Sequence, residues 1–184
     1  MLRGFIAKKK AMTSVYDSAG KRIGVTTLLA KPVKVTAIKT VAKDGYQAVQ
    51  VAFSVKSHQE FLPVSKTLPE INSDLSIDSV FSPGDVISAT AKSKGRGFAG
   101  VIKRWGFHRQ PVTGGQSDRV RAPGSIGAQT PGKVVKGKKM PGHYGNATKT
   151  ISGLKVISIN KESSLIYVSG SVPGAFNSWV TLKK

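Results

Sequence analysis

Hydrophobic and polar residues alternate with a period of two along several stretches of the chain. Residues 33–41 read Val-Lys-Val-Thr-Ala-Ile-Lys-Thr-Val, and residues 46–53 read Tyr-Gln-Ala-Val-Gln-Val-Ala-Phe. β-Branched and aromatic residues in such an alternation predict half-buried β-strands. The turn signal Lys43-Asp44-Gly45 lies between the two stretches, so together they predict an antiparallel hairpin.

Six other stretches have the composition of short strands: 3–7, 12–16, 23–29, 86–91, 154–159 and 164–169. Turns are predicted at residues 17–20 and 160–162, and a short helix with a loop at 65–82. Many short strands at close spacing are typical of a small antiparallel barrel or sandwich. Because strands from both ends of the chain are needed, the expected fold is mainly β with a long segment inserted between strands.

Charge is concentrated in that inserted segment. The chain has 184 residues with 29 Lys and Arg against 9 Asp and Glu, a net charge of +20. Residues 92–149 contain 13 of these basic residues and one acid, Asp118, together with 12 of the 20 glycines and no leucine. Such a segment has too few large apolar residues to form a core. We therefore predict a β body of residues 1–91 and 150–184 and a basic, glycine-rich extension of residues 92–149. A disordered linker is the alternative for the extension.

Composition also limits the chemistry. Cysteine is absent, and the three histidines, His58, His108 and His143, are far apart, so no metal site is expected. No pair of acids suits general acid–base catalysis, and no apolar run approaches the ~20 residues of a membrane span. The N-terminus lacks the apolar region of a secretory signal. We expect a cytoplasmic non-enzyme with no cofactor and no small-molecule substrate, whose partner is a polyanion. Nucleic acid is the first candidate and an anionic membrane surface the second. The membrane is the weaker of the two, because the basic segment has no amphipathic helix longer than about three turns.

Two glycine-rich motifs resemble nucleotide-binding loops but lack their context. Gly95–Gly100 fits G-x-G-x-x-G, yet no crossover helix and second strand follow it, as a dinucleotide site requires. Residues 127–133 nearly match the P-loop, but Val134 stands where Ser or Thr must bind magnesium, and Pro131 removes a backbone donor. Glycines that let the backbone approach a phosphate, beside Lys94 and Arg96, are the better interpretation.

Aromatic residues lie among the basic residues in two clusters. In the first, Val101, Ile102 and Trp105 would form the apolar face of a short helix, and Trp105 with Phe107 would either pack on the body or stack on bases. The second, residues 133–145, has glycines between its lysines, which favours an extended chain in a phosphate-lined channel. Structured RNA offers such channels, whereas duplex DNA more often receives a helix. A solvated charged face is the alternative.

At these clusters the sequence resembles a known family. The motifs are Ser-Lys-Gly-Arg-Gly-Phe-Ala-Gly-Val-Ile-Lys-Arg-Trp-Gly-Phe at 93–107, Arg-Ala-Pro-Gly-Ser-Ile-Gly at 121–127, Thr-Pro-Gly-Lys-Val-Val-Lys-Gly-Lys-Lys-Met-Pro-Gly at 130–142 and Gly-Asn at 145–146. They closely resemble the bacterial type of the large-subunit ribosomal protein L-three family. Residues 4–9, 12–16 and 171–174 are also similar to it, so the resemblance runs nearly end to end. Ala7, Ala11 and Trp105 depart from the family pattern.

The resemblance implies a β-barrel body of the translation-protein type and an extension that threads through rRNA toward the peptidyl transferase centre. It implies direct rRNA binding, a role early in large-subunit assembly, no catalysis, and neighbours that include the L-fourteen and L-nineteen families. Gln129 matches a position that is N5-methylated in some bacteria. The alternative function is a sequence-tolerant basic nucleic-acid-binding protein or RNA chaperone.

Charge and resemblance together predict the rRNA contacts. The residues expected to contact phosphates are Lys94, Arg96, Lys103, Arg104, Arg109, Arg119, Arg121, Lys133, Lys136, Lys138 and Lys139. Those expected to stack on bases or to hydrogen-bond to them are Trp105, His108, His143 and Tyr144.

Overall fold

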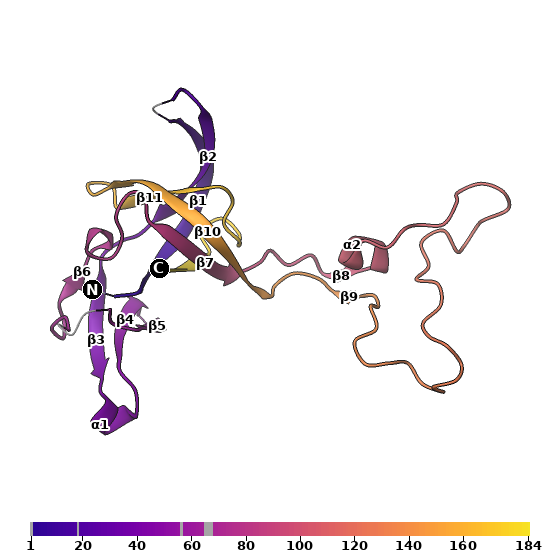
Figure 1. Ribbon diagram of the computed structural model, residues 1–184, viewed down its shortest axis with the longest axis horizontal. Helices are drawn as coiled ribbons and strands as arrows, with labels where there is room; N and C mark the ends of the chain where they lie inside the picture. Colours follow the sequence, from indigo (N-terminus) through magenta and orange to yellow (C-terminus); the bar gives the residue numbers. More distant parts are fainter. Residues whose placement is uncertain (1, 18, 56, 65–67) are drawn as a thin grey trace. The chain divides into compact units, whose positions relative to one another are not determined.

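The computed structural model describes residues 2–17, 19–55, 57–64 and 68–184 (Figure 1). Its elements, in chain order, are β1 (Gly4–Tyr16), β2 (Arg22–Leu29), β3 (Val33–Lys39), α1 (Val41–Asp44), β4 (Ala48–Ser54), β5 (Ser57–Phe61), β6 (Asp74–Leu75), the 3-10 helix η1 (Ile77–Ser79), β7 (Val86–Lys92), β8 (Phe98–Ala99), α2 (Val101–Trp105), β9 (Gly142–His143), β10 (Thr148–Asn160), β11 (Leu165–Ser169) and β12 (Trp179–Lys183).

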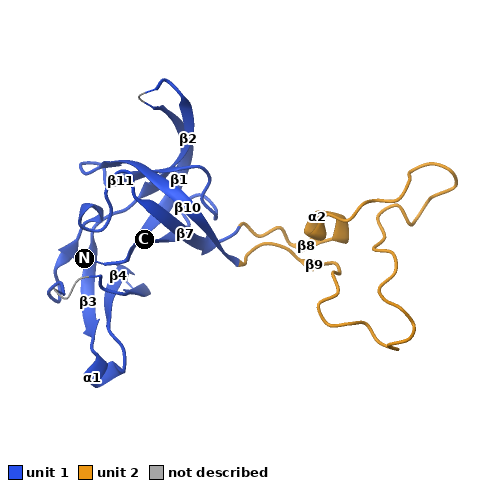
Figure 2. Cartoon of the chain, viewed as in Figure 1, with its two compact units in different colours: residues 1–93, 148–184 blue, residues 94–147 orange. Residues whose placement is uncertain are grey.

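The chain divides into two compact units, which Figure 2 shows in different colours. Unit 1 consists of residues 1–93 and 148–184, and unit 2 consists of residues 94–147. Unit 1 contains both large sheets. Unit 2, all of which the structure describes, contains only β8, α2 and β9 as regular elements.

Six strands of unit 1 form a closed ring in the order β1-β12-β7-β10-β11-β2, with β2 paired back to β1. Every pairing in the ring is antiparallel. The first and last strands are neighbours, since Phe5 of β1 lies opposite Leu182 of β12. The prediction of a mainly β, antiparallel fold is confirmed.

A second sheet, in the order β5-β4-β3-β6, shares one hydrophobic core with the ring. Val35, Val49 and Phe61 from this sheet belong to the same buried cluster as Phe5 and Leu182 from the ring. The two sheets approach closely at Gly4, where an added Cβ would lie 2.7 Å from the Phe61 ring. Glycine at this position therefore allows β5 to pack on β1.

The hairpin predicted at 33–53 is present, but its connection is longer than expected. β3 ends at Lys39 rather than at Val41, and β4 begins at Ala48 rather than at Tyr46. Asp44 explains the difference, because its carboxylate accepts hydrogen bonds from the Thr40 N–H at 3.1 Å and from Lys39 Nζ at 2.9 Å. These bonds stabilise the single helical turn α1, and Gly45 ends it at φ +78°.

Several strand boundaries differ from the prediction. The stretches 3–7 and 12–16 form one strand, β1, which pairs with both β12 and β2 and contains a register shift between Lys9 and Met12. The predicted strand 154–159 is the second half of the longer β10, which contains the buried Leu154 and Val156. The first six residues of β10 are exposed, and Thr148–Ile151 among them pair with β7. The strands β5, β6, β8, β9 and β12 were not predicted. Strands 23–29, 86–91 and 164–169 correspond to β2, β7 and β11.

The segment 65–82 contains β6 and η1, and residues 161–164 form a turn after β10. In the turn predicted at 17–20, the Gly20 N–H donates to the Asp17 carbonyl oxygen at 2.8 Å. Residue 18 of that turn and residues 65–67 of the segment lie outside the described residues.

Candidate nucleic-acid interface

Unit 2 begins and ends in a narrow two-stranded ribbon. β8 pairs with β9, with Phe98 opposite His143. Next to this pair, the Arg96 N–H donates to the Tyr144 carbonyl at 2.8 Å, and the Tyr144 N–H donates to the Gly97 carbonyl at 2.9 Å. The ribbon therefore holds the two ends of unit 2 together by backbone hydrogen bonds.

Gly145 lies at the end of the ribbon, where any side chain would require the backbone to shift. Its φ is +79°, in the left-handed region, and an added Cβ would clash with the backbone carbonyl oxygen of Lys94. The glycine thus permits the close approach of residues 94–95 to residues 145–146.

The short helix predicted around residues 101–105 is present as α2. Val101 is buried, Ile102 is partly buried, and Trp105 keeps 41% of its surface exposed. Gly106 ends the helix at φ +73° and donates its N–H to the Ile102 carbonyl. The exposed end of the helix therefore carries the tryptophan.

Trp105 is held in a cluster with basic residues of unit 2. Its indole N–H and Arg104 Nη1 both donate to the Met140 carbonyl oxygen, at 2.9 and 2.8 Å. The Arg104 guanidinium lies 4.9 Å from the Trp105 ring centroid, and Lys139 Nζ lies 5.8 Å from it. These contacts attach residues 139–140 to α2 and place two cations beside one aromatic ring.

A similar group lies at the ribbon. The Arg96 guanidinium is 5.9 Å from the Tyr144 ring centroid, and the His143 ring meets Phe98 edge-on at 6.1 Å. Arg96, His143 and Tyr144, predicted separately as RNA-binding residues, are therefore brought together by the register of β8 and β9.

The rest of unit 2 is open chain. Residues 106–141 form no helix or strand, and no residue from 102 to 147, all of which the structure describes, is buried. Local turns give the segment its shape: the Gln110 N–H donates to the Val120 carbonyl at 3.0 Å, and the Gly132 N–H donates to the Gln129 carbonyl at 2.8 Å. Gln129 is exposed in its turn.

The predicted phosphate-contacting residues are exposed, apart from the partly buried Arg104. Within the part of the chain that the structure describes, none of them forms an ion pair, since the ion pairs Lys39–Asp44, Lys161–Asp78 and Lys184–Asp85 all belong to unit 1. The one acid of unit 2, Asp118, is also exposed. Eleven basic side chains thus leave unit 2 with uncompensated positive charge.

The structure does not bring every predicted residue into a cluster. The side chains of Lys133, Lys136 and Lys138 lie exposed along the open segment. His108, Arg109, Arg119 and Arg121 are also exposed, outside the ribbon and α2.

The nucleotide-loop motifs do not acquire the context that they lacked in the sequence. Gly95–Gly100 leads into the two-residue β8 and the five-residue α2 instead of a crossover helix, and residues 127–133 follow no strand. Among the described residues, no three metal-ligating side chains gather, and no helix has the length and apolar character to cross a membrane.

Sequence reasoning missed two features. One is the Met140 carbonyl oxygen, a backbone atom that carries no side-chain signal. The other is a lysine-rich groove on unit 1, whose members come from both ends of the chain. The only sequence signal for the groove is the run of three lysines at 8–10, of which the first and third, Lys8 and Lys10, line it.

Comparisons with known proteins place these features in a family. Residues 63–165 match the family model described as Ribosomal protein L3. "Large ribosomal subunit protein uL3" of Dehalococcoides mccartyi is 41% identical over 202 aligned positions, which cover 100% of this chain and 98% of that protein. The proteins of the same name from Herpetosiphon aurantiacus and Sulfurihydrogenibium are 40% and 42% identical, with 100% of this chain and 97% and 91% of those proteins covered.

These alignments are longer than this chain, so the relatives contain residues that it lacks. The similarity nevertheless includes both units and the whole basic segment. It identifies a ribosomal protein rather than an enzyme. On the family match and the full-length identity, the chain belongs to the ribosomal protein L3 family.

Proposed function

We propose that this chain is a structural constituent of the large ribosomal subunit and that unit 2 binds rRNA directly. The observation that carries the proposal is the set of eleven basic side chains in unit 2, which have no ion-pair partner among the residues that the structure describes and almost no core beneath them. A phosphate backbone supplies the missing counter-charge, and its bound counterions are released as the contacts form.

The cluster around Trp105 and the group around Tyr144 would fix the register in which unit 2 binds the rRNA. Trp105 and Tyr144 are both at least one-third exposed, and each has a cation near its ring. Such a pair offers a stacking surface for an unpaired base and a charge for the adjoining phosphate. The open segment between the clusters would take its final shape as the rRNA folds around it, because its own contacts are few.

Unit 1 would serve as the anchor. We assign its strand ring to the β-barrel of translation-protein type, and place the protein among early-assembling components of the cytoplasmic large subunit. Neighbours of the L-fourteen and L-nineteen families and an approach of unit 2 toward the peptidyl transferase centre follow from the family resemblance. Gln129, exposed in a turn, is accessible to an N5-methyltransferase.

The test is sedimentation of a cell lysate through a sucrose gradient after a high-salt wash, with detection of this chain. We expect the chain to remain with the large subunit, because contacts threaded through folded rRNA cannot be exchanged one at a time for salt. If it sediments alone, a sequence-tolerant nucleic-acid-binding protein becomes the better description.

Direct binding to an rRNA fragment is a second test. Neutralising 8–10 phosphates predicts a log-affinity versus log-salt slope of roughly −6 to −9. A slope shallower than about −3 would contradict the electrostatic account.

A further inference from the structure

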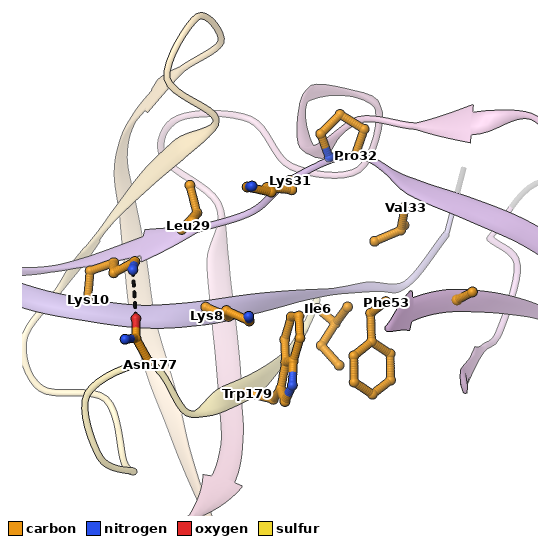
Figure 3. Close-up of a pocket in the computed structure, with 11 residues that line it drawn as sticks. Ile6, Lys8, Lys10, Leu29, Lys31, Pro32, Val33, Phe53, Asn177 and Trp179 are labelled. Carbon is orange, nitrogen blue, oxygen red and sulfur yellow. Dashed lines mark hydrogen bonds between the residues drawn. The ribbon is translucent and has the colours of Figure 1, made fainter. Parts of the chain in front are cut away.

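Unit 1 has a groove that the proposed function of unit 2 does not use. It lies beside β1 and β12, is bounded by residues 29–33 and by β4, and has a volume of about 490 Å³. Figure 3 shows Trp179 of β12 beside Ile6 and Phe53, with Lys8 and Lys10 along β1 and Lys31 on the opposite side. The volume is within the ~300–1,000 Å³ of sites that bind small organic groups.

The aromatic wall of the groove is fixed in place and partly uncovered. The Phe53 ring meets Trp179 edge-on, with 4.8 Å between centroids, so the indole is supported from the side. Trp179 still exposes 37% of its surface. Nearby, Phe176 exposes 63% of its surface. Exposed aromatic rings are suited to stacking on planar groups.

A lysine lies over Trp179 and another over Phe176. Lys8 Nζ lies 4.5 Å from the Trp179 ring centroid, and Lys10 Nζ lies 5.2 Å from that of Phe176 while donating to Asn177 Oδ1 at 2.6 Å. Lys31 is exposed across the groove. None of the described lining residues is acidic, so the three ammonium groups have no carboxylate within the groove. Their occupant is expected to be an anion that also has a flat apolar face.

We propose that this groove binds an unpaired nucleotide of single-stranded RNA, with its base against Trp179 and its flanking phosphates on Lys8, Lys10 and Lys31. The proposal rests on the proposed function, to which it adds a second RNA contact on unit 1. An exposed cation–π contact is weaker than a base–aromatic stack, so the incoming base replaces Lys8 on the indole. The displaced ammonium then pairs with a phosphate, and the exchange leaves no charge unpaired.

Fluorescence of Trp179 tests the proposal in the full chain. The chain has two tryptophans, so Trp105→Phe leaves Trp179 as the only indole reporter. A ten-nucleotide single-stranded oligouridylate is expected to quench this emission by stacking. Replacement of Lys8, Lys10 and Lys31 by Gln should weaken the quenching affinity about tenfold and reduce the log–log salt slope by about two, at ~0.7 per phosphate contact. A matched triple, Lys21, Lys43 and Lys183 to Gln, removes the same charge from unit 1 outside the groove and should change the affinity less than about threefold.

Thermal melting of each variant separates lost binding from lost folding. If the groove variant is destabilised, ultraviolet crosslinking of a 4-thiouridine oligonucleotide to the Trp105→Phe chain replaces it, and the crosslink should map to residues 176–179.

Absence of quenching together with absence of this crosslink overturns the proposal. Equal losses in the two triple variants also overturn it, because the effect is then of net charge. Quenching by decaglutamate as strong as that by RNA would instead identify an acidic peptide as the occupant. Any of these results leaves the proposed function standing if the chain still sediments with the large subunit.

Discussion

Unit 1 and unit 2 differ in how many side chains they bury and in whether their charged residues are paired. Unit 1 buries side chains from two sheets in one core, whereas unit 2, whose residues the structure describes throughout, buries only Ala99 and Val101. Unit 1 pairs several of its charges, while the basic residues of unit 2 have no ion-pair partner among the described residues. The difference indicates that folding free energy and affinity for a polyanion come from different parts of the chain, because burial supplies the first and unpaired charge the second.

The largest expected effect is on folding. Ile166→Ala removes a fully buried side chain of β11, and Ile126→Ala makes the same substitution at a residue of unit 2 that is 45% exposed. We expect the first to lower the free energy of unfolding by about 2–5 kcal/mol and the second by less than about 0.5 kcal/mol. Denaturant unfolding followed by circular dichroism measures both. Similar losses would mean that unit 2 also depends on a core.

The next effect is on binding. Replacing Lys136, Lys138 and Lys139 by Ala removes three exposed charges from unit 2. The log–log salt slope for a large-subunit rRNA fragment should become shallower by about 2–3, at ~0.7–0.9 per contact, while the melting temperature stays nearly constant. The same change at Lys21, Lys43 and Lys183 of unit 1 is the control, with a smaller expected effect on the slope. A sharp fall in melting temperature for the unit 2 variant would show that its lysines belong to the fold.

A smaller, local effect is expected at the ribbon. Gly145→Ala places a Cβ against the Lys94 carbonyl at φ +79°, whereas Gly137→Ala has a similar φ of +83° and open space around the Cβ. Both variants bear a left-handed penalty of ~1 kcal/mol or more, but only the first must separate the ribbon. Hydrogen exchange of the Arg96 and Tyr144 amides should therefore accelerate in Gly145→Ala alone. Equal acceleration in both variants would mean that the backbone conformation, not the close approach, is decisive.

The smallest effect is on the pH dependence of unit 1. Lys184 Nζ, at 2.7 Å, and the Ser82 N–H hold the pKa of Asp85 below its ordinary value of 3.8. A lowered pKa in the folded state stabilises the protein above about pH 4, and this contribution is lost as the pH falls through the folded-state pKa. Asp85→Asn should therefore lower the melting temperature slightly at pH 7 and less at pH 3. An equal difference at the two pH values would exclude the ion pair as the cause.

Alternating burial made several strands predictable from the sequence. β2, β7 and β11 each have an apolar side facing the core, so their pattern is visible in the sequence. The first half of β10 is exposed and is held by pairing with β7, which leaves no hydrophobic pattern. The continuity of β1 through Lys8–Lys10 likewise depends on neighbours from elsewhere in the chain. β12 also alternates, as Trp-Val-Thr-Leu-Lys, so its pattern too is present in the sequence although no strand was predicted there.

The residues of the candidate interface could be predicted from the sequence, but their grouping in space could not. Charge density identified the basic residues of unit 2 because nothing in that segment can bury them. The grouping of Arg104 and Trp105 on the Met140 carbonyl spans about 35 residues of irregular chain, for which no periodicity exists. The unit 1 groove joins Lys8 to Trp179, and only ring closure brings them together.

The pairing of β12 with both β1 and β7 also sets an order of events during synthesis. Until residue 183 has been made, the ring lacks one strand and two strand edges have no partner. The basic unit, which ends at residue 147, is complete well before that point. A nascent chain can therefore present unit 2 to RNA while the edges of β1 and β7 in unit 1 are still unpaired and prone to aggregation.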